Sequence, residues 1–88
     1  MKVQYFATLR KITGKNEETM EAKNIDQLLK KIINKYGDDF KNAIYESNNL
    51  KKGVIILKNG KNILYLNNFE TSFEDDDIVS IFPPVGGG

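Results

Sequence analysis

The C-terminal part of the chain combines a strand-like run with a tail that has no side chains at its tip: Ile78-Val79-Ser80-Ile81-Phe82-Pro83-Pro84-Val85-Gly86-Gly87-Gly88. The run of β-branched and aromatic residues from 78 to 82 predicts a strand that leads directly into the tail. Each proline fixes φ near −65°, so Pro83 and Pro84 are expected to hold the root of the tail extended and away from the fold. Gly86 and Gly87 have no Cβ and suit a narrow channel. The six residues from 83 to 88 span about 20 Å when fully extended.

The terminal residue, Gly88, is the chemically distinctive group of the sequence. Its α-carboxyl has a reference pKa of about 3.5 and is ionised in the cell. A carboxylate can attack the α-phosphate of ATP to give an acyl-adenylate, which sulfide or amine nucleophiles then open. The sequence has no base, metal or phosphate cradle for that step, so another protein must supply them. The competing interpretation is an ordinary frayed chain end.

The composition excludes several classes of function. The 88 residues make a single domain and include neither cysteine nor histidine. Disulfides, zinc-thiolate sites and the usual nucleophile and general base are therefore absent, and a self-contained enzyme is not expected. The net charge of +1 gives no reason to expect a nucleic-acid partner. No signal-peptide core or membrane-length apolar run occurs, so a cytoplasmic protein without a membrane partner is predicted.

The N-terminal part predicts a β-hairpin. Residues 2–10 alternate, which predicts a strand with one buried face made of Val3, Tyr5, Ala7 and Leu9. Residues 13–16 form the predicted turn, and residues 17–22 the second strand.

The segment from Ile25 to Tyr36 predicts an amphipathic helix. Its apolar residues recur at helical spacing, at Ile25, Leu28, Leu29, Ile32, Ile33 and Tyr36. Asn24 is the expected N-cap, with Gln27 completing a capping box, and Gly37 ends the helix. Residues 38–52 are less regular. A short helix with Phe40, Ala43 and Ile44 on one side is expected there, ended by Asn48-Asn49.

The C-terminal half predicts three further strands. Residues 53–58 form a continuous apolar run that indicates a strand covered at least partly on both faces. Asn59-Gly60 is the signature of a type I′ hairpin turn, which predicts a short returning strand in residues 61–66. Residues 74–77 form an acidic turn, with Asp75, Asp76 and Asp77 interpreted as solvated side chains rather than a metal site. The final strand, residues 78–82, follows that turn.

These elements predict an α+β fold with a mixed four- to five-stranded sheet and one main helix on one face. The domain is expected to cover residues 1–82 and the tail residues 83–88. Strand alternation places Val79 and Ile81 toward the helix, and Phe6, Ile78 and Phe82 on the open face. If the first and last strands are neighbours, these three residues form an apolar patch beside the tail, which marks an interaction site. Alternatively, loop residues such as Leu64 or Phe69 cover them.

The chain resembles the MoaD/ThiS family of ubiquitin-like sulfur carriers, and within it the small subunits of molybdopterin synthases. Three stretches carry this resemblance: Phe6-Ala7-Thr8-Leu9-Arg10, Asn59-Gly60, and residues 78–85 leading to Gly87-Gly88. The family usually has a small non-glycine residue at the position of Gly86, and commonly a glycine at that of Asp76. The resemblance implies a ubiquitin-like β-grasp fold along nearly the whole chain.

The resemblance also implies a reaction cycle carried out by partner enzymes. An E1-like adenylating enzyme would use ATP to adenylate Gly88, and a sulfur donor would convert it to a thiocarboxylate. The molybdopterin synthase large subunit would then accept the tail and take up the sulfur. No cofactor bound to this chain is implied. The expected partner-binding residues combine the open face, the root of the tail and a position suggested by the family: Phe6, Ile63, Ile78, Phe82, Pro83, Pro84 and Val85.

Three alternatives remain open from the sequence. The same Gly88 adenylate can end as an isopeptide on a lysine, which would make the chain a protein modifier. Sulfur carriage for thiazole synthesis or transfer-RNA thiolation uses similar carriers, although those of the thiazole type tend to lack an insert such as residues 38–52. The last alternative is a binding domain with an inert tail.

Overall fold

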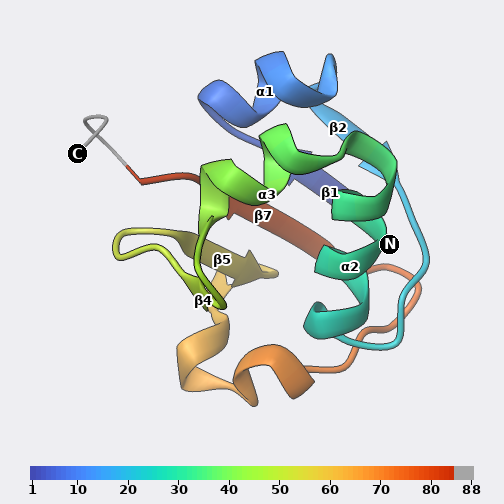
Figure 1. Ribbon diagram of the computed structural model, residues 1–88. Helices are drawn as coiled ribbons and strands as arrows, with labels where there is room; N and C mark the ends of the chain where they lie inside the picture. Colours follow the sequence, from blue (N-terminus) through green and yellow to red (C-terminus); the bar gives the residue numbers. More distant parts are fainter. Residues whose placement is uncertain (85–88) are drawn as a thin grey trace.

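The central sheet of the computed structural model, which describes residues 1–84, has five strands in the spatial order β2-β1-β7-β5-β6 (Figure 1). Their bounds are Lys2–Tyr5 (β1), Glu17–Thr19 (β2), Ile55–Lys58 (β5), Lys61–Asn62 (β6) and Ile78–Phe82 (β7). β1 and β7 pair in parallel at the centre, and the other neighbours are antiparallel. This mixed sheet confirms the predicted α+β class and places the first and last strands side by side.

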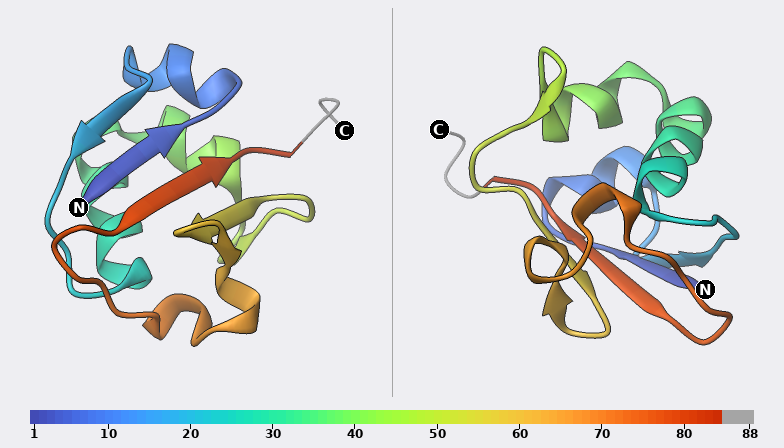
Figure 2. Two further views of the ribbon diagram at one scale, coloured as in Figure 1. Left: turned by 180° about the vertical axis from the view of Figure 1, so that it is seen from behind. Right: turned by 90° about the horizontal axis from the view of Figure 1, so that it is seen from below.

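Helix α2, Ile25–Tyr36, packs across one face of the sheet, as the sequence predicts (Figures 1 and 2). The Asn24 side chain accepts a hydrogen bond from the Gln27 N–H at 2.9 Å, which confirms the N-cap. The second half of the capping box differs, since Gln27 Oε1 accepts from the Lys23 N–H at 2.7 Å rather than from Asn24. Gly37, at φ 80°, follows the last residue of the helix.

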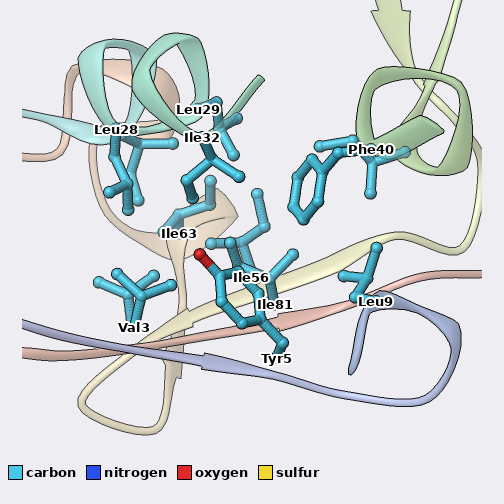
Figure 3. Close-up of a cluster of buried hydrophobic side chains, with 13 residues drawn as sticks. Val3, Tyr5, Leu9, Leu28, Leu29, Ile32, Phe40, Ile56, Ile63 and Ile81 are labelled. Atoms are coloured by element: carbon cyan, nitrogen blue, oxygen red, sulfur yellow. The ribbon is translucent and has the colours of Figure 1, made fainter. Parts of the chain in front are cut away.

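Helix α3, Asp38–Ile44, follows directly and covers the same face of the sheet. Phe40 and Ile44 are fully buried, as expected for a short helix in this segment, and the Phe40 ring lies edge-on to Tyr5 with 5.9 Å between centroids. Figure 3 shows Val3, Tyr5 and Ile81 of the sheet meeting Leu28 and Ile32 of α2 and Phe40 of α3. The hydrophobic core therefore lies entirely between the helices and one face of the sheet.

The predicted strand over residues 2–10 is wrong beyond Tyr5. The chain turns at Ala7, with φ 53° and ψ −131°, and forms a short helix, α1, Thr8–Thr13. Leu9 is buried as predicted, but from the helix, while Ala7 is exposed. In a strand every second residue faces the core. One helical turn can bury residues that are four positions apart, which is also an even spacing, so the two patterns look alike over a few residues.

Other boundaries also differ from the sequence prediction, and β5 begins at Ile55 rather than at residue 53. β2 ends at Thr19, and α3 ends at Ile44, before a small hairpin of β3, Tyr45–Glu46, and β4, Asn49–Leu50. The returning strand β6 has only two residues, after which the chain forms two 3₁₀ turns, η1, Ile63–Tyr65, and η2, Asn68–Glu70.

The Asn59-Gly60 turn joins β5 to β6 with Lys58 opposite Lys61. Asn59 and Gly60 have φ values of 50° and 83°, as a type I′ turn requires, which confirms the prediction. The Asn59 side chain also donates to Asp77 Oδ1 at 2.8 Å and accepts from the Ile78 N–H at 2.9 Å. Asp77 is therefore a buried structural carboxylate, and its interpretation as a solvated turn residue was wrong.

Candidate partner-binding face and tail root

The face of the sheet opposite the helices carries the candidate site (Figure 2, left). Strand β7 alternates as predicted, with Val79 and Ile81 fully buried beneath the helices. Ile78, Ser80 and Phe82 therefore point to the open face. Because β7 is the central strand, this face extends over β1 on one side and β5 on the other.

Phe6 and Phe82 form the centre of the site. Their rings stack with 4.2 Å between centroids and 14° between planes, and both are half-buried. Phe6 follows β1 and Phe82 ends β7, so the parallel pairing of these strands brings the two rings together. The turn at Ala7 then leads the chain away, leaving Phe6 beside the root of the tail. The predicted juxtaposition of the two residues is thus observed.

Two residues of β5 extend the aromatic pair into an apolar surface that the sequence prediction did not include. Ile55 lies opposite Phe82 and Leu57 opposite Ser80, so both point to the open face, and Ile55 is 42% exposed. The sequence signal was available, since the Asn59-Gly60 turn fixes the alternation of β5. We call Phe6, Phe82, Ile55 and Leu57 the aromatic face.

Ile78 does not join the aromatic face. It is 39% exposed, but it lies four residues from Phe82 along β7, about 13 Å away in an extended strand. Ser80 lies between them, and its hydroxyl donates to Gln4 Oε1 at 3.1 Å. The predicted three-residue patch is therefore divided by a polar pair.

Arg10 lies against the aromatic face. Its Nε donates to the Tyr5 carbonyl at 2.8 Å, and its guanidinium carbon lies 5.1 Å from the centroid of the Phe6 ring. The helix α1 that carries it was not predicted, and this cation–π contact was therefore not predicted either. Arg10 is exposed, and adds one positive charge at the edge of an otherwise apolar surface.

The root of the tail lies against the fold rather than away from it. Pro83 is buried and Pro84 half-buried. Pro84 packs beside the glycine that precedes β5, because a Cβ placed on Gly53 would lie 3.5 Å from the Pro84 Cβ. The remaining residues predicted for the tail, Val85, Gly86, Gly87 and Gly88, lie outside the described residues.

Two other expectations from the sequence change. Ile63 is 2% exposed and belongs to the core, so it does not face solvent as a partner-binding residue would. Of the two residues considered as a cover for the open face, Leu64 is itself 67% exposed and Phe69 packs against the core cluster.

The ionisable groups with shifted pKa values serve the fold. Burial would raise the pKa of Glu18, but hydrogen bonds from Lys35, Tyr36 and Tyr5 outweigh it and lower that pKa to about 2. Burial also opposes ionisation of Asp77, yet the Glu74 N–H and the Asn59 amide hold its pKa below the usual range. Within residues 1–84 no group of acidic side chains is arranged to hold a metal ion. None of the helices in this range is both long and apolar enough to cross a bilayer.

The arrangement is suited to recognition rather than to catalysis. Across the described part of the chain, the side chains of the aromatic face beside the tail root are aromatic and aliphatic, and Arg10 lies at one edge of them. These groups can bury against a partner protein, but they offer neither an activated nucleophile nor a general base.

Comparisons with known proteins agree with this description. The model of the ThiS family matches residues 3–88. Small archaeal modifier protein 3 of Haloferax volcanii is 30% identical over 91 residues, covering 100% of this chain and 98% of that protein.

Two solved structures support the same assignment. The small archaeal modifier protein 1 of Methanosarcina acetivorans superposes with a TM-score of 0.86 at 34% identity, covering 99% of this chain and 94% of that one. A Pyrococcus furiosus chain described as subunit 1 of a molybdopterin converting factor gives 0.72 at 28% identity, covering 96% and 95%. These likenesses confirm the ubiquitin-like β-grasp fold. The chain belongs to the ThiS family of ubiquitin-like sulfur carriers.

Proposed function

We propose that the chain carries sulfur as a thiocarboxylate on Gly88 for the synthesis of the molybdenum or tungsten cofactor. The observation that supports this most is the family match, which runs through the tail to residue 88. The aromatic face beside the root of the tail adds a surface on which a partner can hold the domain while the tail enters its active site.

The proposed chemistry takes place in partner enzymes. The Gly88 carboxylate attacks the α-phosphate of ATP, and pyrophosphate leaves. Hydrosulfide supplied by the donor then attacks the carbonyl carbon of the acyl-adenylate and AMP leaves, which yields the thiocarboxylate. In the cofactor pathway the acceptor takes the sulfur, and water restores the carboxylate. The likeness to the chain described as a molybdopterin converting factor subunit favours a synthase large subunit as the second partner.

A second candidate function is protein modification. Two of the similar proteins are named small archaeal modifier proteins, and both are at least 30% identical to this chain. Both functions begin with the same Gly88 adenylate. They differ only in the nucleophile, since a lysine amine would release AMP and leave an isopeptide bond.

Intact-mass measurement on the protein purified from its own cells separates the two functions. Carriage predicts a population with one oxygen of Gly88 replaced by sulfur. Modification predicts cellular proteins whose lysines retain a glycine remnant after proteolysis. If neither species forms when the sulfur supply is ample, the proposal of Gly88 activation is contradicted.

A further inference from the structure

Arg10 is the single arginine of the chain, and the other twelve basic residues are lysines. Arginine and lysine are not interchangeable where a planar acceptor must be bound through two parallel hydrogen bonds. The position of this one guanidinium, on Phe6 and beside the tail root, is therefore informative.

The structure holds the guanidinium at one edge, and the residues it describes supply no partner for the other edge. Nε is held by the Tyr5 carbonyl at 2.8 Å, and the Phe6 ring lies under the guanidinium with 5.1 Å between Cζ and the ring centroid. Within residues 1–84 neither terminal nitrogen of Arg10 has a hydrogen-bond acceptor, and no carboxylate forms an ion pair with it. An arginine oriented in this way is prepared to bind an anion that a docked partner brings.

The surroundings of Arg10 favour a carboxylate as that anion. Phe6, Phe82 and Ile55 form an apolar surface that a partner protein can cover and shield from water. An ion pair at the edge of such a contact fixes how the two proteins align. A nucleic-acid backbone would require several cations along one surface. The aromatic face instead presents apolar side chains next to a single guanidinium.

We propose that Arg10 forms a bidentate pair with an aspartate or glutamate of the enzyme that adenylates Gly88. This inference rests on the proposed function, since it assumes that this enzyme docks on the aromatic face. The pair would fix the rotation of the domain on the enzyme, because Phe6 contacts both Arg10 and Phe82, and Phe82 leads directly into the tail. Arg10 is thus a positioning residue for the tail.

Substitution tests the requirement for a planar fork. The affinity of the full-length chain for the adenylating enzyme of the same cells is measured by calorimetry without ATP, so that no nucleotide phosphate can act as the acceptor. Arg10→Lys and Arg10→Met should each weaken binding by about tenfold or more. Lys11→Met, at the neighbouring exposed position of α1, should change it by less than about twofold. Wild-type affinity in Arg10→Lys would overturn the bidentate pair.

A measurement on the wild-type chain avoids any loss of folding in the variants. Because the chain has one arginine, ¹⁵N-arginine labelling makes every labelled side-chain signal that of Arg10. That signal should shift at saturation with the enzyme, and rotation of its terminal nitrogens should slow. If the signal is unchanged while the chain is still adenylated, the role of Arg10 is contradicted and the proposed function is not. A chain that neither binds nor is adenylated would contradict the proposed function, and the inference with it.

Discussion

Glu18 is the residue that ties the edge of the sheet to the main helix. From β2 its carboxylate accepts hydrogen bonds from the hydroxyls of Tyr5 at 2.6 Å and Tyr36 at 2.5 Å, and from Lys35 Nζ at 2.7 Å. Burial raises the pKa of Tyr5, and the charge of Glu18 raises it further, so the two tyrosines remain donors. These contacts join three separate elements through one ionised group.

The lowered pKa of Glu18 makes the stability of the fold sensitive to acid. Its folded pKa of about 2 lies below the usual value of 4.5, so its contribution to stability is complete above pH 4.5 and is lost as the pH falls toward 2. Glu18→Gln should lower the free energy of unfolding by about 1–3 kcal/mol at neutral pH and flatten its decline in acid. Urea unfolding at a series of pH values measures this.

Glu17→Gln is the matched control for that substitution. Glu17 is half-exposed and pairs with Lys2 at 3.3 Å on the open face. Its removal should change stability by less than about 1 kcal/mol and leave the decline in acid unchanged. An unaltered acid decline in Glu18→Gln would show that Glu18 is not its source.

At the scale of elements, Ala7 decides where the first strand ends. Its φ of 53° with ψ of −131° is a conformation that residues with a Cβ rarely adopt. It separates β1 from α1 and thereby places Phe6 against Phe82 and Arg10 against Phe6. The local strain at this position is therefore part of how the aromatic face is built.

Ala7→Gly should stabilise the protein. Glycine adopts this conformation without the Cβ penalty, and the exposed Ala7 side chain contributes little packing. Glycine also raises the backbone entropy of the unfolded chain, which offsets part of this gain. The expected net increase in the free energy of unfolding is up to about 1 kcal/mol. Ala43→Gly, inside α3, should instead cost about 1 kcal/mol. Thermal unfolding compares the two, and a loss of stability in Ala7→Gly would show that its backbone is not strained.

The sequence predicted the elements whose signals are local and redundant. Helix α2 combines an apolar stripe, an N-cap at Asn24 and a terminal glycine, and the β5–β6 turn needs only Asn59 and Gly60. Helix α1 was missed because six residues give too little periodicity, and because a positive φ at an alanine cannot be read from composition. Asp77 was misjudged because its partner, Asn59, lies 18 residues away in the chain.

At the scale of the whole molecule, the sheet has one face sealed by helices and one left open. Strand β7 buries Val79 and Ile81 on the face that the helices cover, and it presents Phe82 on the open face. Its last residue then passes into the buried Pro83, so the tail begins from a fixed point on the fold. A partner that holds the aromatic face would thereby also hold the origin of the tail.

This separation predicts different consequences for two phenylalanines. Phe82→Ala should cost about 1–2 kcal/mol of stability, since its ring is half-buried and stacked, but should weaken partner binding by about tenfold or more. Phe40→Ala, in the core, should cost about 3–5 kcal/mol. Melting temperatures and the affinity for the adenylating enzyme measure both effects. A Phe82→Ala chain that loses as much stability as Phe40→Ala would show that Phe82 is a core residue.

The candidate site could be predicted only where strand alternation determines it. Phe6 and Phe82 follow from the first and last strands, and Leu57 follows from the turn at Asn59 once that rule is applied to β5. Ile63 was expected at the partner-binding surface from the family resemblance alone, whereas the 3₁₀ turn that begins at Ile63 places it in the core. Arg10 depends on a helix and a ring contact that no local pattern contains.

The most direct test of the account is adenylation at the end of the chain. The full-length protein is incubated with ATP and its adenylating enzyme, and ATP–pyrophosphate exchange is measured for three forms: the wild type, a chain lacking Gly88, and a chain with one residue added after it. Melting temperatures confirm that all three fold. The account predicts exchange with the wild type and none with either altered tail. Exchange at the wild-type rate in the extended form would contradict the assignment of the Gly88 carboxylate as the reacting group.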